Sequence, residues 1–302
     1  MKRIQKLLAL ALALLMLLGL SACGLSDLPV IKSILGITQH DSFHVDLTGE
    51  FGMDAHVPAY GMEVSVGFTA AGEGDYRAAP LQFAADIRAE AQKEIGRLLL
   101  YGEDRSGSFV LSYSLDGGAT WGEKALGNTA DISSGIDSGS SLSFTDMLKL
   151  GKGLSTAFSG FTKAGRETVN GQEATRYDAS MRLRLILNEQ SVRDAVLQAL
   201  AEQLKTDVSA LEGKLDFSAA EDVYFSFWLE DKDSRLVQIR IDMADAMNSL
   251  LRSGLLAAVL ESAGLPGDLG LTADLSAMNL TLTFSNFNGV DAVTRPSGEP
   301  AV

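Results

Sequence analysis

The chain has 302 residues, of which 46% are hydrophobic, and it carries a formal charge of −14 at pH 7. This hydrophobic content excludes an intrinsically disordered stalk. The negative charge argues against nucleic acid as a partner, since a phosphate backbone attracts basic proteins, and its simplest role is to keep the protein soluble.

The first 22 residues are predicted to form a secretion signal. Residues 2–6 contain three basic side chains, and residues 7–18 are an unbroken apolar run that is shorter than the roughly 20 residues of a membrane span. Two small residues then precede Cys23, which is the only cysteine of the chain. Residues 20–23, Leu-Ser-Ala-Cys, resemble the lipobox of bacterial lipoproteins. The resemblance implies cleavage before Cys23, attachment of acyl chains such as palmitate to it, and anchoring to the extracytoplasmic face of the cell membrane.

The mature chain is expected to divide into three parts. Residues 23–40 are a tether with a short helix, for which Asp27 is an N-cap candidate and Pro29 suits the first turn. Residues 41–290 form a single domain, and residues 291–302 form a polar C-terminal tail. With Cys23 acylated no thiol remains for a disulfide, so stability rests on apolar burial.

The first half of the domain has the period-two alternation of antiparallel strands. Apolar residues alternate in the segments 43–47, 62–68 and 81–87, and strands continue at 98–102 and 109–115. Residues 114–121, SLDGGATW, match the Asp-box pattern of sialidase-type propellers. The motif occurs once, whereas a propeller repeats it in each blade, and Asp116-Gly117 is a strong hairpin signal. The segment is therefore interpreted as a hairpin.

The second half alternates helices with hairpins. Residues 127–141 are rich in Gly, Ser and Asp and are predicted to form a loop. Helices are predicted at 144–158, from 188 to about 204, and at about 244–263. Strands are predicted around the Asn170-Gly171 turn and on to Leu187, in a hairpin at 223–243, and at 280–284.

These elements predict an α+β fold, in which a curved antiparallel sheet carries about three helices on its concave face. The apolar stripes of the helices must be buried against something. Full contact with the sheet would make an ordinary core, and incomplete contact would leave an apolar ligand cavity. The residues expected to line such a cavity are Phe144, Met147, Leu148, Leu154, Phe158, Met247, Leu251, Leu255 and Val259.

Catalytic motifs are missing from the sequence. It has no nucleophile elbow, phosphate-binding loop, dinucleotide fingerprint or cysteine pair. A metal site at His44 and His56, assisted by Asp46 or Asp54, is conceivable, but solvent-facing polar residues of the first strands explain these side chains better. We therefore expect no enzyme activity, no cofactor and no metal.

The order of elements resembles the LolA/LolB and LppX/LprG superfamily of envelope proteins. The resemblance rests on the short N-terminal helix, on residues 42–51 (SFHVDLTGEF), 170–181 (NGQEATRYDASM) and 228–241 (WLEDKDSRLVQIRI), and on the terminal strand before a P-x-x-x-P tail. It implies a half-barrel closed by helices that carries lipids or acyl chains. The function expected is a membrane-anchored lipoprotein that binds a hydrophobic ligand. The alternative is a structural or sensory envelope module that binds another protein through an open sheet edge or the 127–141 loop.

Overall fold

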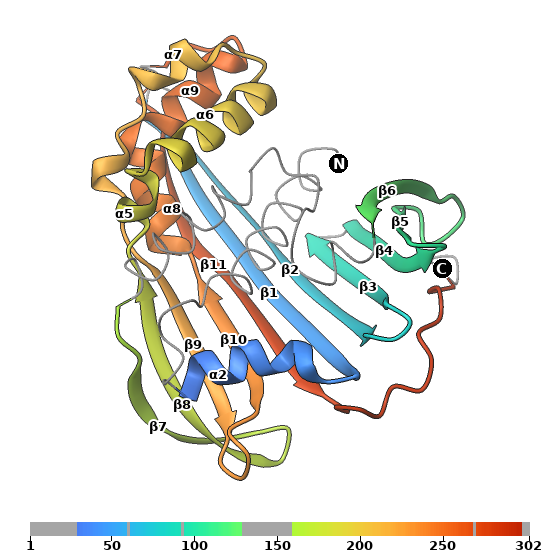
Figure 1. Ribbon diagram of the computed structural model, residues 1–302. Helices are drawn as coiled ribbons and strands as arrows, with labels where there is room; N and C mark the ends of the chain where they lie inside the picture. The colour runs from blue at the N-terminus through green and yellow to red at the C-terminus, as the bar shows by residue number, and fades with distance from the viewer. Residues whose placement is uncertain (1–28, 59–60, 92–93, 129–158, 268–269, 298–302) are drawn as a thin grey trace.

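The computed structural model describes residues 29–58, 61–91, 94–128, 159–267 and 270–297, which form one large antiparallel sheet with helices (Figure 1). The sheet has eleven strands in the order β6-β5-β4-β3-β2-β1-β11-β10-β9-β8-β7. The strands are β1 (Ser42–Val57), β2 (Met62–Arg77), β3 (Gln82–Ala91), β4 (Glu94–Arg105), β5 (Ser108–Ser114), β6 (Gly122–Asn128), β7 (Thr162–Val169), β8 (Gln172–Met181), β9 (Val223–Glu230), β10 (Leu236–Asp242) and β11 (Thr272–Ser285). The α+β class and the antiparallel sheet predicted from the sequence are confirmed.

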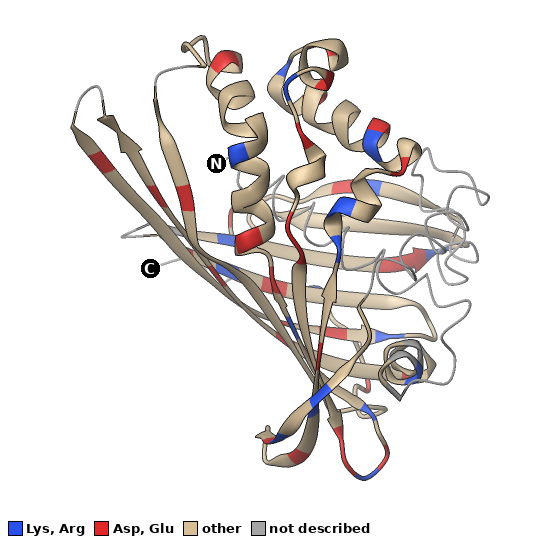
Figure 2. Cartoon of the chain, turned by 90° about the vertical axis from the view of Figure 1, so that its left-hand side faces the viewer, with Lys and Arg blue, Asp and Glu red and all other residues tan. Residues whose placement is uncertain are grey.

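The helices lie on one side of this curved sheet, as Figure 1 and the perpendicular view in Figure 2 show. The α-helices are α2 (Pro29–Gly36), α5 (Leu183–Leu187), α6 (Gln190–Leu204), α7 (Val208–Glu212), α8 (Ala244–Leu250) and α9 (Leu256–Ser262). Helix α2 crosses one end of the sheet, and α5 to α9 gather at the other. We call the side that carries the helices the concave face.

The last strand of the chain lies beside the first. β1 pairs with β2 along its whole length and with β11 on its other side, so the N-terminal and C-terminal strands meet in the middle of the sheet. The pairing of β11 with β1 shifts register after Gly52, where a β-bulge follows. The pairing of β11 with β1 joins the β1–β6 meander and the β7–β10 hairpins into one sheet.

Two buried clusters hold the helices in place. One joins α2 and α8 to the sheet through residues such as Val30, Phe225 and Ala246. The other joins α6, α7 and α9 to one another through Leu197, Leu211 and Ala258. Most of the buried apolar area therefore lies at the β8–β10 side and within the helical layer.

The helices differ from the prediction in number and extent. The strand expected to run to Leu187 ends at Met181, and residues 183–187 form α5, because Leu187 joins the buried cluster of α6 and α7. The helix expected at 244–263 is interrupted by a π-helical stretch, Leu251–Leu255. The described chain consequently has more than the three helices expected. The predicted helix at 144–158, and the predicted loop beyond residue 128, lie outside the described residues.

Candidate functional site on the concave face of the sheet

Apolar side chains of alternate residues line the concave face. On β1 the odd-numbered positions from Val45 to Val57 face this side, and the charged residues between them face the other side. The strand register places further apolar residues beside them. These are Leu275, Met278, Leu280, Leu282 and Phe284 on β11, and Val64, Val66 and Phe68 on β2.

Helix α2 covers one end of this apolar surface. Val30 is fully buried, and Ile34 packs into the same cluster as Val45, Ile239 and Leu282. The Ser33 hydroxyl donates a hydrogen bond to the carbonyl oxygen of Ser234, which fixes the helix against the β9–β10 turn. The beginnings of β1 and β10 and the end of β11 are thereby shielded from water.

Helix α8 covers the other end of the apolar surface and contacts β11 through the side-chain amide of Asn248. Asn248 is buried, its Nδ2 donates to the carbonyl oxygen of Leu275 (3.0 Å), and its Oδ1 accepts from the Leu275 N–H (2.6 Å). β10 pairs with β11 only from Asn279 to Thr283, so Leu275 has no strand partner on that side. The Asn248 side chain completes the hydrogen bonding of β11 in place of a strand.

The surface between α2 and α8 is apolar and remains partly exposed. Phe51 of β1 stacks on Phe68 of β2 with ring centroids 4.9 Å apart, and both rings keep contact with solvent. Leu47 and Leu280 are likewise only partly buried. The four buried clusters found among the described residues include none of these side chains. An apolar surface of this kind favours contact with another apolar molecule.

The candidate cavity residues of the 244–263 segment occupy several environments. Leu255 packs against the helical cluster, whereas Met247 and Leu251 are partly exposed and Val259 is 38% exposed. Gly254 has a φ of +113° within the π-helical stretch. This irregular turn rotates the residues after it relative to those before it. The buried residues are therefore Ala246 and Ser249 before the turn and Ala258 and Leu260 after it, and they do not form one continuous apolar stripe along the helix.

The remaining sequence-predicted site residues lie outside the described part of the chain. They are Cys23, Phe144, Met147, Leu148, Leu154 and Phe158.

Two surface pockets have defined linings, and neither includes Met247, Leu251, Leu255 or Val259. One of about 400 Å³ lies at the β7–β9 edge and is lined mostly by hydroxyl groups, Asp178 and Tyr224. The other, of about 290 Å³, lies between the β7–β8 turn and the end of β11 and contains Arg235 and Phe287. Arg235 already pairs with Glu230 there.

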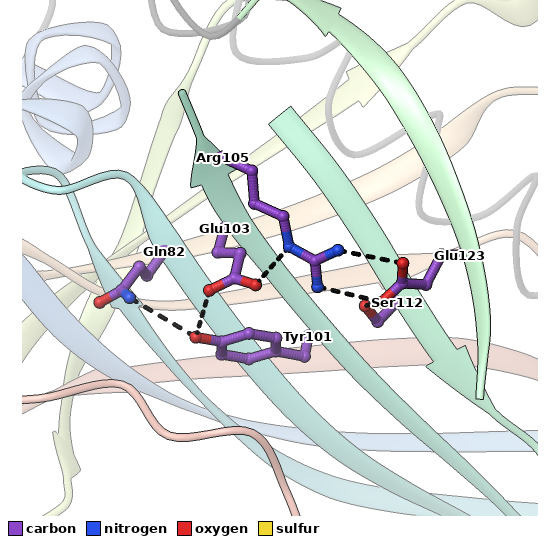
Figure 3. Close-up of polar contacts among 6 residues, drawn as sticks. All are labelled: Gln82, Tyr101, Glu103, Arg105, Ser112 and Glu123. Atoms are coloured by element: carbon purple, nitrogen blue, oxygen red, sulfur yellow. Dashed lines mark hydrogen bonds and ion pairs between the residues drawn. The ribbon is translucent and has the colours of Figure 1, made fainter. Parts of the chain in front are cut away.

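A polar network on the opposite face joins β3 to β6 (Figure 3). Arg105 donates from Nε to Glu103 (2.7 Å) and from its two terminal nitrogens to Glu123 (both 3.0 Å), while the Tyr101 hydroxyl donates to Glu103 (3.1 Å). Gln82 and Ser112 complete it. The hydrogen bonds that Arg105 donates to Glu123 and Glu103 raise the pKa of Arg105. Those that it donates to Glu123 also lower the pKa of Glu123. The side chains of the network are paired with one another across β3 to β6, which is typical of a structural role.

The three histidines do not come together as a metal site. His44 lies between Asp75 (2.8 Å from Nδ1) and Asp46 (3.5 Å from Nε2), whereas His56 faces Glu63 at 3.8 Å. Partial burial opposes protonation of His44, but the hydrogen bond and charge of Asp75, aided by Asp46, raise its pKa overall. Among the described residues no group of three or more His, Cys, Asp or Glu side chains is arranged to hold a metal ion.

The SLDGGATW segment forms a hairpin turn, as predicted. It connects β5 to β6, and Tyr113 pairs with Gly122 across the turn. Asp116 accepts from the N–H of Thr120 (2.9 Å) and from the Ser114 hydroxyl (2.7 Å), and its carboxylate also accepts from the Thr120 hydroxyl. These hydrogen bonds lower the pKa of Asp116 to about 2, and the one from the Thr120 hydroxyl has the largest effect. The motif therefore stabilises the turn through hydrogen bonds within it.

No family model matches the chain, and no curated protein matches it by sequence. Among solved structures, the Mycobacterium tuberculosis lipoprotein LppX is similar over 88% of this chain and 96% of its own, with 15% identity and a TM-score of 0.37. LprF from Mycobacterium bovis is similar over 89% of this chain and 96% of its own, with 12% identity and a TM-score of 0.38. A β-barrel-like protein of a domain of unknown function from Brucella abortus covers 80% and 95%, with 8% identity and a TM-score of 0.22.

LppX is one of the proteins that give their names to the superfamily that the sequence resembles.

The cavity predicted from the sequence lies between helices and sheet, but the residues named for it all belong to predicted helices. Leu47, Phe51, Phe68 and Leu280 are the side chains that line the partly exposed surface. The alternation of these strands was visible in the sequence. Alternation shows that one face is apolar, but it cannot show whether helices cover that face.

Proposed function

We propose that the chain is a lipoprotein, anchored by acylated Cys23 to the extracytoplasmic face of the cell membrane, that binds a lipid or acyl chain on its concave face. The observation that carries this proposal is the partly exposed apolar surface between α2 and α8. Leu47, Phe51, Phe68 and Leu280 supply the sheet side of the site. Met247 and Leu251 are proposed to supply its helical side.

The predicted export signal and the composition of the concave surface support this function. The signal-like segment with Cys23 predicts export and acylation. Among the described helices, none combines the length and hydropathy that a membrane span requires. Polar groups are scarce on the concave surface, so recognition would depend on the area and shape of an apolar ligand more than on directed hydrogen bonds.

Native mass spectrometry of the mature protein from its own host tests ligand binding, together with titration of a fluorescent fatty acid. We expect a co-purifying lipid and saturable probe binding. The double variant Leu47→Ser, Phe51→Ser should weaken probe binding about tenfold or more, because it removes two large apolar contacts. Thr48→Ser on the opposite face is the matched control and should bind as the wild type does. Absence of both lipid and probe binding in the wild type would refute the proposal.

Membrane anchoring requires a separate experiment. Cys23→Ala should abolish metabolic labelling with a palmitate analogue, since the cysteine thiol is the group that takes the diacylglyceryl anchor. Unchanged labelling of this variant would contradict the anchor.

A further inference from the structure

Part of β2 has a strand partner on only one side. β2 pairs with β1 from Met62 to Arg77, but it pairs with β3 only from Thr69 onward. In the described parts of the chain no other strand or backbone group bonds to residues 62–68 on the side away from β1. Alternate N–H and C=O groups of these residues therefore point outward from the sheet. We call residues 62–68 the free edge of β2.

The free edge is apolar and exposed. Met62 is 53% exposed, Val64 43% and Val66 39%, all on the same face of the strand. The next apolar residue on this face, Phe68, keeps partial solvent contact. An unpaired strand edge with exposed apolar side chains readily accepts another strand.

The two outer edges of the sheet carry features that discourage such pairing, and the free edge of β2 does not. β6 pairs with β5 through an irregular register near Phe109, and β7 has a register shift before Gly165. Both strands also carry lysine, at Lys124 and Lys163. Residues 62–68 contain no lysine, arginine or proline, and their register with β1 is regular. Register irregularities and lysines protect the outer edges against pairing with another strand, and residues 62–68 have neither feature.

Negative charge surrounds the free edge. Glu50, Asp54, Glu63 and Asp274 lie on the adjoining parts of β1, β2 and β11, and residues 50–57, 62–68 and 272–278 contain no lysine or arginine. Asp274 pairs with Arg252 (2.8 Å), whereas the Glu63 side chain faces only His56, at 3.8 Å, and is 85% exposed. A partner strand would meet apolar side chains on one face and carboxylates on the other.

We propose that residues 62–68 of β2 bind an extended segment of a partner protein as an added strand, and that this segment alternates apolar and basic residues. The apolar side chains would pack beside Val64 and Val66, and the basic ones would lie beside Glu63. Main-chain hydrogen bonds to the outward groups would supply the affinity, and the alternation would supply the specificity. This inference does not depend on lipid binding at the concave face.

The probe is an eight-residue peptide of alternating valine and lysine, titrated against the full mature chain by fluorescence anisotropy. Two N-methylated forms of the peptide carry the methyl groups on one or the other set of alternate residues. An added strand uses the N–H groups of one set only, so one form should bind like the parent and the other about tenfold or more weaker. Hydrogen exchange should show protection of residues 62–68 by the parent peptide.

A matched pair of variants locates the charge contact. Glu63→Lys should weaken peptide binding about tenfold through repulsion. Glu73→Lys makes the same charge change on the same strand, at a position paired to both β1 and β3, and should leave binding unchanged. Equal binding of the two N-methylated forms, equal losses in the two variants, or protection at β6 or β7 instead would overturn the proposal. Dimerisation of the free protein that protects residues 62–68 would also overturn it, because the occupant would be a second copy.

Discussion

Gly254 is a residue that only the tertiary structure requires to be glycine. Its φ is +113°, and a Cβ atom built there would overlap the carbonyl oxygen of Lys214. We expect Gly254→Ala to lower the free energy of unfolding by about 2–4 kcal/mol, since it combines backbone strain with a steric clash. Urea denaturation measures this loss. Gly213→Ala is the control, because Gly213 has an ordinary φ of −84° and open space at Cβ, and it should change stability by about 0.5 kcal/mol or less. Equal midpoints for the two variants would contradict the clash.

Asp86 makes stability depend on pH. Arg97 donates to both of its carboxylate oxygens (2.9 and 2.6 Å), and these hydrogen bonds outweigh burial and lower the pKa of Asp86. A lowered folded-state pKa contributes stability above the unfolded value of about 3.9, and the contribution is lost as the pH falls below it. Asp86→Asn should therefore cost about 1–3 kcal/mol at pH 7 and progressively less below pH ~4. Thermal unfolding across this range checks the trend. Exposed, unpaired Glu73 on the neighbouring strand gives the control Glu73→Gln, for which no such trend is expected.

At the scale of elements, the docking of α8 onto β11 depends on Asn248. Its amide satisfies both backbone groups of Leu275, and Asn248→Leu would leave that N–H and C=O buried without partners. We expect a loss of about 2–4 kcal/mol and faster hydrogen exchange at Leu275. Asn279→Ala on the same strand removes only a 3.5 Å contact with Glu50 and should change stability by about 0.5 kcal/mol or less. Unchanged exchange at Leu275 in Asn248→Leu would show that α8 is held by apolar packing alone.

At the scale of the whole molecule, the two ends of the described chain brace opposite faces of the sheet. Helix α2 packs on the concave face, whereas the C-terminal segment packs behind β3–β6. There Val293 is buried against Ala84 and Tyr101, and the Arg295 guanidinium lies 3.9 Å from the ring centroid of Trp121. The C-terminal tail, which the sequence predicts to be polar, thus contributes a buried apolar contact through Val293.

This bracing predicts a local effect of mutation in the C-terminal segment. Val293→Asp should destabilise the protein by about 2–3 kcal/mol and accelerate hydrogen exchange in β3–β6 before other strands, because it places a charge in an apolar contact. Exposed Thr294 provides the control, and Thr294→Asp should leave the exchange pattern as it is. Uniform acceleration over the whole sheet in Val293→Asp would show that the segment does not act locally.

Much of the sheet could be predicted from the sequence because strand alternation and hairpin turns are local signals. Residues 43–47, 62–68 and 223–243 alternate, and Asp116-Gly117 and Asn170-Gly171 mark turns that the structure contains. Residues 183–187 were misassigned because a short apolar segment with period-two spacing suits a strand as well as a turn of helix. Burial of Leu187 among the helices decided between the two.

What the sequence by itself determined was which side chains are apolar and the order in which they alternate, since both are properties of neighbours along the chain. Tertiary structure alone decided that β11 lies beside β1, that Gly254 breaks a helix, and that Phe51 and Val64 stay in contact with solvent. The physical reason is that exposure and strand pairing depend on segments more than 200 positions apart, such as Phe51 and Met278, and no local pattern records which distant segments meet.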